Sequence, residues 1–475
     1  MTPRPVCFLL VLFAAVVLLG CASTARVQRD LTEQMLRGDY SAALQLVERE
    51  KDRSFRGKNQ LLYFLEKGML LQIEGRYVES NAAFEQAKRI GDALYTKSLS
   101  GVGLSMMTND YALAYAGENF ERTLVHLFSA VNYEMLGDLE SALVEARQVE
   151  DYLRKLQVDA GSGNSYREDA FARYLSALLY EAGGEYGSSL VDYKKAIAGY
   201  AVYADEFALQ PPPSLYENAE RVAARLGRWA QDDLRALGSP GKVRTIPEGE
   251  GELIILHYNG LSPVKGQTKV AIPFSEAWLL VAAIQATADE RAREDINRAT
   301  AFVGALEGVD VISVAFPKYV DRPYRIARME PLVAKATRIT GPELVEDIGA
   351  IAEKDLEDRK ALIYTKSVAR AAIKYAIQKG VEAAARESGD QQALLVAGTQ
   401  LLGGLARYAS EQADKRVWST LPDQIWMSSM VLPAGVHVLE VDFVTAQSVP
   451  VESRTIPNVE VSPGQRRFVI LRTVK

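Results

Sequence analysis

The stretch Glu74-Gly75-Arg76-Tyr77 decides the fold of the first half of this chain, because apolar residues at helical spacing precede and follow it. Glycine adopts the left-handed conformation that ends many helices without the steric cost that other residues meet. The small residues Ala82 and Ala83 would let a second helix approach the first, and Phe84 would fill the space between them. We therefore predict a helical hairpin with its turn at Gly75.

Three further copies of this signature predict an array of helical hairpins. They are centred on Gly38, Gly137 and Gly184, so the four turn glycines lie 37, 62 and 47 residues apart. A regular array would repeat at about 34 residues, and we therefore expect irregular loops. The helical domain is predicted to cover residues 31–237, including one last helix after three consecutive prolines.

The second hairpin resembles the tetratricopeptide repeat. Gly68, Gly75, Tyr77, Phe84 and Ala87 occupy the small, turn and packing positions of that family, with a serine in place of one usual alanine. The resemblance implies a concave surface that holds peptides or partner proteins. The alternative is an all-helical bundle in which the glycine turns are incidental.

Polar and aromatic residues gather in the middle of the array and form a candidate binding groove. They extend from the segment Tyr115–Arg122 to the segment Ala142–Arg147. On an inner face they would contact a partner; alternatively, they form ion pairs between two hairpins or solvated i,i+4 pairs. The candidate residues are Tyr115, Glu118, Arg122, Asn132, Tyr133, Glu145 and Arg147.

The composition changes after Gly238-Ser239-Pro240-Gly241, which we interpret as a domain boundary. Residues 245–475 are predicted to form a mixed α+β domain with a helical insert over about 342–416 and a C-terminal antiparallel β-sheet over 425–475. The predicted fold class of the whole chain is α+β. The expected strands cover 252–258, 269–274, 309–316, 324–336, 425–431, 436–443, 458–461 and 467–472, with a helix over about 278–306.

The first twenty residues have the pattern of a secretory signal. An apolar run of fourteen residues, Val6–Leu19, leads into Leu18-Leu19-Gly20-Cys21. A membrane-spanning helix needs about 20 residues, so residues 1–20 are predicted to be a cleaved signal peptide. The leucine and glycine before Cys21 fit a lipoprotein signal peptidase site, and the alternative is an ordinary signal with an incidental cysteine. The resemblance to bacterial lipoproteins implies two or three acyl chains on Cys21.

Residues 21–30 are predicted to be the lipidated N-terminus and a tether. Because Ala22 and not an aspartate follows the cysteine, the sorting rule of Gram-negative lipoproteins implies the periplasmic face of the outer membrane. The inner membrane is the alternative. Cys7 lies in the predicted signal peptide, so Cys21 would be the only cysteine of the mature chain, and no disulfide framework is expected.

The composition argues against several function classes. A net charge of −6 without a clustered basic surface argues against nucleic-acid binding. His126, His257 and His437 lack the spacing of metal ligands, and we expect neither a metal nor a cofactor. Ser262 and Lys265 match one motif of penicillin-interacting enzymes, but the motifs that should follow it are missing. We identify no catalytic residue.

Taken in order, the motifs of the chain resemble a family of uncharacterised bacterial envelope lipoproteins. After the lipoprotein signal and the repeat-like helices come the loop residues Asn259, Gly260, Pro263 and Lys265, an Ala-Phe-Pro segment, and the run Ala413–Pro422. In some genomes, members of this family are encoded beside a lipoprotein activator of penicillin-binding proteins. The resemblance implies a place in cell-wall upkeep and no established activity.

We predict a non-enzymatic scaffold or adaptor that binds envelope proteins and is attached to the membrane through its lipid. The alternative is an enzyme or ligand-binding protein with a site between the 259–265 loop and the C-terminal sheet. The candidate residues of that site are Asn259, Lys265 and Arg416. A deep pocket lined by these three would favour the alternative, and a shallow aromatic groove would favour the scaffold.

Overall fold

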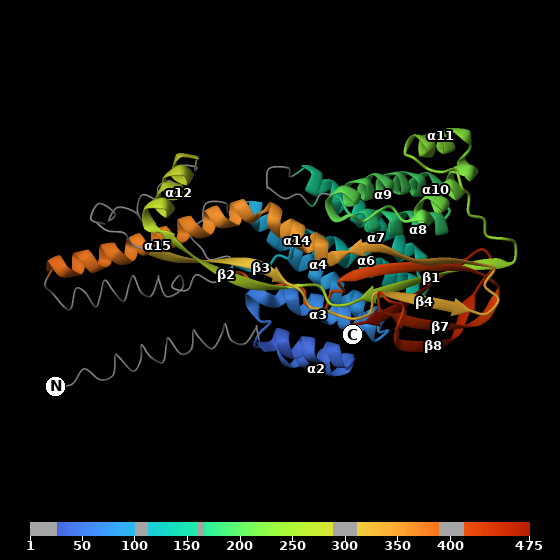
Figure 1. The fold of residues 1–475 in the computed structure, drawn as a ribbon, viewed down its shortest axis with the longest axis horizontal. Coiled ribbons are helices and arrows are strands. Elements are labelled where there is room, and N and C mark those ends of the chain that lie inside the picture. The colour runs from blue at the N-terminus through green and yellow to red at the C-terminus, as the bar shows by residue number, and fades with distance from the viewer. Residues whose placement is uncertain (1–25, 100–112, 159–165, 167, 288–310, 389–412) are drawn as a thin grey trace.

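The structure, a computed structural model, describes residues 26–99, 113–158, 166, 168–287, 311–388 and 413–475. The chain has the predicted α+β class, with helices in its first half and antiparallel sheets in its second (Figure 1). Cys21 and the signal segment lie outside the described residues, and the predicted tether is wrong over residues 26–30, which are helical, with Val27 buried in the core. None of the helices described combines the length and the apolar run needed to cross a membrane.

The helical half consists of consecutive hairpins joined at the glycines that the sequence indicates. Gly38, Gly75, Gly137 and Gly184 all have positive φ angles, between +73° and +76°, and this confirms the predicted turns. Gly68 approaches the next helix so closely that a Cβ there would lie 2.4 Å from the ring of Phe84. In the described part of this half, residues 26–37 are helical, and the helices that follow are α2 (Tyr40–Arg49), α3 (Gln60–Ile73), α4 (Tyr77–Leu99), α6 (Asn119–Leu136), α7 (Leu139–Val158), α8 (Ala170–Ala182), α9 (Tyr186–Phe207), α10 (Pro213–Leu226) and α11 (Arg228–Ala236).

The described residues of the second half form three sheets. The largest has the order β5-β6-β1-β9, in which β1 is antiparallel to β6 and parallel to β9. Its strands are β1 (Glu250–Asn259), β5 (Arg338–Asp347), β6 (Gln424–Pro433) and β9 (Arg466–Thr473). A second sheet contains β4 (Arg328–Val333), β7 (Gly435–Val444) and β8 (Pro450–Val461), and a third pairs β2 (Val264–Pro273) with β3 (Val311–Val320). The helices of this half are α12 (Phe274–Thr287), α14 (Ile348–Asp358) and α15 (Lys360–Ser388).

The predicted helical insert is wrong at its start. Residues 342–347 are the second half of the edge strand β5, and helical structure begins only at Ile348. Pro342 lacks the N–H that a central strand would need, but an edge strand tolerates it, and the pairing of β5 with β6 shifts register just there. The segment that follows residue 412 is not helical either.

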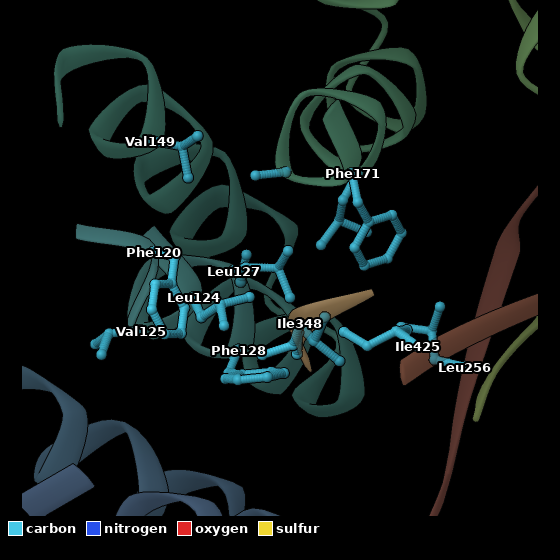
Figure 2. Packing of buried hydrophobic residues seen from close by; sticks show 14 of the residues in the cluster. Phe120, Leu124, Val125, Leu127, Phe128, Val149, Phe171, Leu256, Ile348 and Ile425 are labelled. Carbon is cyan, nitrogen blue, oxygen red and sulfur yellow. The ribbon is translucent and has the colours of Figure 1, made fainter. Parts of the chain in front are cut away.

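One hydrophobic core extends across the boundary at Gly238-Ser239-Pro240-Gly241. Figure 2 shows Phe128 of α6, Leu256 of β1 and Ile425 of β6 within the same cluster. A second core fills the space between the large sheet and the β4-β7-β8 sheet. A third lies apart, where α12 and α15 pack on β2 and β3 and extend from the body (Figure 1). The helical array and the large sheet therefore form a continuous body.

Candidate functional site

The segment Ala413–Pro422, which we call the docked segment, lies against the helical array. Trp418 is fully buried, and its ring meets those of Phe84 and Phe128 at centroid distances of 5.8 Å each. Both contacts are edge-to-face, a favourable arrangement for aromatic pairs. A stretch far along the sequence therefore fills the space between α4 and α6.

Two buried carboxylates of the array bind the backbone of the docked segment. Glu66 of α3 accepts hydrogen bonds from the amides of Ser419 and Thr420 at 2.8 and 3.0 Å and from their hydroxyls at 2.7 and 2.6 Å. Burial raises the pKa of Glu66, and these hydrogen bonds oppose part of the shift. Glu121 of α6 accepts the amide of Trp418 at 2.8 Å.

Glu121 also joins the docked segment to the candidate groove. Its second oxygen accepts from the hydroxyl of Tyr115 at 2.5 Å and from the amide of Glu118 at 2.9 Å. Burial, with the nearby charge of Glu118, raises the pKa of Glu121 to about 7. A carboxyl that ionises near neutral pH therefore lies under the docked segment.

Glu118 binds two cations from the second half of the chain. Its oxygens accept from Lys265 of β2 and, at 2.6 Å, from Arg359, which follows α14. Burial acts to raise the pKa of Glu118, but the charges of Arg359 and Lys265 outweigh it and leave the pKa below the ordinary value. The groove residue Glu118 and the loop residue Lys265, predicted for separate sites, are therefore direct partners.

Arg416 belongs to the same contact. It binds Asp414 at 2.6 Å and the backbone oxygen of Leu113 at 2.9 Å, and its guanidinium lies 5.3 Å from the ring centroid of Tyr115. With Arg416, Lys265, Tyr115 and Glu118, four of the ten predicted groove and loop residues meet at one place. We call this group, together with Arg359, the junction cluster. Tyr115, Lys265 and Arg416 are buried between the array and the second half, and Glu118 and Arg359 are mostly covered, so these residues hold the two halves together and leave little surface for an external partner.

The other predicted groove residues do not share that place. Asn132 is fully buried among Gln72, Ser80 and Asn81 and cannot line an open groove, because these polar groups already bind its side chain. The remaining groove residues have partners within the array. Arg122 binds Asp92 at 2.6 Å, and Glu145 binds Lys88 at 2.6 Å and His126 at 2.9 Å. Arg147 binds Glu185 at 2.8 Å on the surface, and Tyr133 packs against the core.

The side chain of Asn259 binds partners other than those of Lys265 and Arg416. Its side-chain nitrogen donates to the backbone oxygen of Ile326 at 2.8 Å, and its side-chain oxygen accepts from the hydroxyl of Thr473 at 2.8 Å. Ile326 and Thr473 therefore hold the side chain of Asn259, whereas Lys265 and Arg416 belong to the junction cluster.

The sequence indicated some of these contacts and missed others. Glu66 could have been noticed, because it is a charged residue within the apolar helix α3, where a buried partner is needed. Arg359 carried no such signal in a helical, charge-rich stretch. No group of three or more metal-ligating side chains is found among the residues that the structure describes.

An open cavity lies elsewhere, between the array and the turn that joins β8 to β9. It has a volume of about 610 Å³, and none of the ten predicted residues lines it. The chain matches no protein-family model and no curated protein.

Proposed function

We propose that this protein is a non-enzymatic scaffold of the bacterial cell envelope, anchored by lipid on Cys21 to the periplasmic face of the outer membrane. The lipoprotein signal at Leu18–Cys21 supports the anchor, and the sequence resemblance supports a role related to the cell wall. Its partners would be envelope proteins.

The observation that carries the scaffold role is the fastening of the array to the rest of the chain. Glu66 and Glu121 bind the docked segment, and Glu118 binds Lys265 and Arg359. These contacts join the array to the second half, so that the helices α7 and α9, which carry exposed valines and which we call the outer helices, would be presented at a constant spacing. Because its own chain fills the face at the junction, a partner has to contact the array from outside.

The outer helices α7 and α9 offer equivalent positions for such contacts. Val144 and Val191 each stand seven residues after a turn glycine, and their exposed fractions are 44% and 51%. Exposed valines at matching places on successive hairpins are suited to an extended partner surface.

Crosslinking in intact cells followed by purification of the native lipidated protein tests the proposal. We expect a specific envelope protein to be retained by the wild type and lost from the double variant Val144→Glu, Val191→Glu. A control variant, Val78→Glu, changes a valine that is 67% exposed on α4, outside those two helices. Retention of the same proteins by all three would exclude the outer helices as the binding surface.

The anchor has its own test. Cells grown with labelled palmitate should incorporate label into the wild type and not into Cys21→Ser. Equal labelling, or unchanged membrane fractionation of the variant, would refute the anchored scaffold.

The second candidate function, a ligand-binding protein, is favoured by one observation. The cavity beside the β8–β9 turn is lined by charged side chains of both halves of the chain. It differs in place from the site predicted at the 259–265 loop.

A further inference from the structure

The cavity beside the β8–β9 turn lies where two helical hairpins end. Gly137 belongs to the turn between α6 and α7, Ala182 ends α8, and Gly464 belongs to the β8–β9 turn; all three line the cavity. Its volume of about 610 Å³ falls in the range of small-molecule sites, which is roughly 300–1,000 Å³.

A buried ion network forms the floor of the cavity. Arg221 of α10 binds Glu181 of α8 with two nitrogens, at 2.6 and 3.0 Å. Arg466 of β9 binds the same carboxylate at 2.7 Å and Glu252 of β1 at 2.9 Å. Burial acts to raise the pKa of Glu181, but Arg466 and Arg221 outweigh it and lower the pKa to about 2. Glu181 is therefore ionised and fully used by the two arginines.

Arg221 retains a donor that the protein does not use. Its side chain is only 8% exposed, and its Nη1 has no hydrogen-bond partner among the described residues. A buried donor without an acceptor costs about 1–3 kcal/mol, and more when it is charged. Because protein atoms cover Nη1, an acceptor group in the cavity would reach this donor only after the Arg221 side chain shifts.

Positive charge also exceeds negative charge at the cavity wall. Four arginines line it, against three glutamates. Arg467 has no ion pair within the described part of the chain. One of the glutamates, Glu134, has a buried oxygen without a partner, and burial, against the charges of Arg466 and Arg467, raises its pKa to about 7. When protonated, this carboxyl can donate a hydrogen bond and does not offset the arginines.

We propose that this cavity binds a small ligand through a carboxylate, which would pair with the guanidinium of Arg467 and, after a shift of its side chain, with the unused donor of Arg221. The planar fork of arginine matches the two oxygens of a carboxylate. The carboxylate has two sources, a free dicarboxylate ion or the C-terminus of a short peptide. The inference is independent of the scaffold role, because it rests neither on the exposed valines of α7 and α9 nor on the anchor.

Calorimetric titration of the full-length lipidated protein in detergent micelles tests the site. The probes are succinate, a tripeptide with a free C-terminal carboxylate, and the same tripeptide with an amidated C-terminus. We expect succinate or the free-acid peptide to bind and the amidated peptide to bind at least tenfold more weakly. Which of the two binds more tightly distinguishes the two sources.

The variant Arg467→Gln should weaken binding of the preferred probe about tenfold, which corresponds to about 1.4 kcal/mol for one charge-assisted contact. The matched control is Arg235→Gln on α11, whose side chain is 60% exposed and pairs with Asp232. Thermal unfolding of both variants shows that they are folded. Failure of every carboxylate probe to bind, or equal affinity in wild type and Arg467→Gln, would overturn the proposal.

Discussion

Replacing Trp418 with alanine tests whether the docked segment holds the two halves of the chain together. The side chain is fully buried and contacts two aromatic rings. A buried tryptophan removes about 200 Å² from water, which at about 25 cal/mol per Å² corresponds to about 5 kcal/mol. This is an upper value, because an unfolded chain already buries part of that area. We expect Trp418→Ala to lower the free energy of unfolding by about 4 kcal/mol, in line with other buried aromatic truncations.

Urea unfolding followed by circular dichroism measures this effect, and the chain supplies a matched control. Trp229 on α11 is 58% exposed, so Trp229→Ala makes the same chemical change outside the core. Its cost should stay below about 1 kcal/mol. If the two variants unfold at the same urea concentration, the packing of Trp418 between α4 and α6 does not stabilise the fold, and the docked segment does not hold the two halves of the chain together.

Three further variants test separate contacts by the same urea assay. Gly68→Ala should lower the free energy of unfolding by about 1–3 kcal/mol, because the added Cβ would lie 2.4 Å from a packed aromatic ring. The control Gly187→Ala, where the added Cβ would meet no atom within 4 Å, should be nearly neutral. Equal effects of the two variants would contradict the close helix packing. Lys265→Met should lower the free energy of unfolding by about 3 kcal/mol, because it leaves Glu118 with one cation fewer. The control Lys242→Met, at a side chain that is 67% exposed, should lower it by less than about 1 kcal/mol. The reverse order would contradict a stabilising role of the junction cluster. Burial raises the pKa of Glu134 to about 7, so the native state keeps a proton that the unfolded state releases, and stability should fall as the pH rises from about 4.5 to about 7. Glu134→Gln should reduce that slope between about pH 4.5 and about pH 7, and an unchanged slope would contradict the burial of its charge.

The features that the sequence predicted correctly are local ones. A glycine between two amphipathic patterns specifies a left-handed turn within a few residues, and Gly38, Gly75, Gly137 and Gly184 all form such turns. The strands of the C-terminal region were recognisable for the same reason, since alternation and Pro-Gly turns are properties of short stretches.

Long-range pairing was not predictable from these patterns. β1 pairs with β6, whose register joins Glu250 to Pro433 across an intervening helical region, and no residue in either strand indicates its partner. The strand β5 was missed because Leu344 has helical spacing to Ile348 and Ile351 of α14, although Leu344 itself lies in β5. Pairing with β6, which the local pattern does not indicate, stabilises this strand. The residues of the junction cluster were recognised, but partners such as Lys265 of Glu118 lie more than a hundred residues away, where no local pattern connects them.

The closure of the array also limits how this protein can bind a partner. For a partner peptide to reach the surface under the docked segment, that segment must first leave. Burial of Trp418 alone opposes this step by about 4 kcal/mol, which corresponds to an open fraction on the order of 10⁻³. Loss of the hydrogen bonds to Glu66 and Glu121 lowers the fraction further. A partner that selected the open form would have its apparent affinity reduced by the same factor, so binding at the outer helices or in the cavity beside the β8–β9 turn is favoured over displacement of the docked segment.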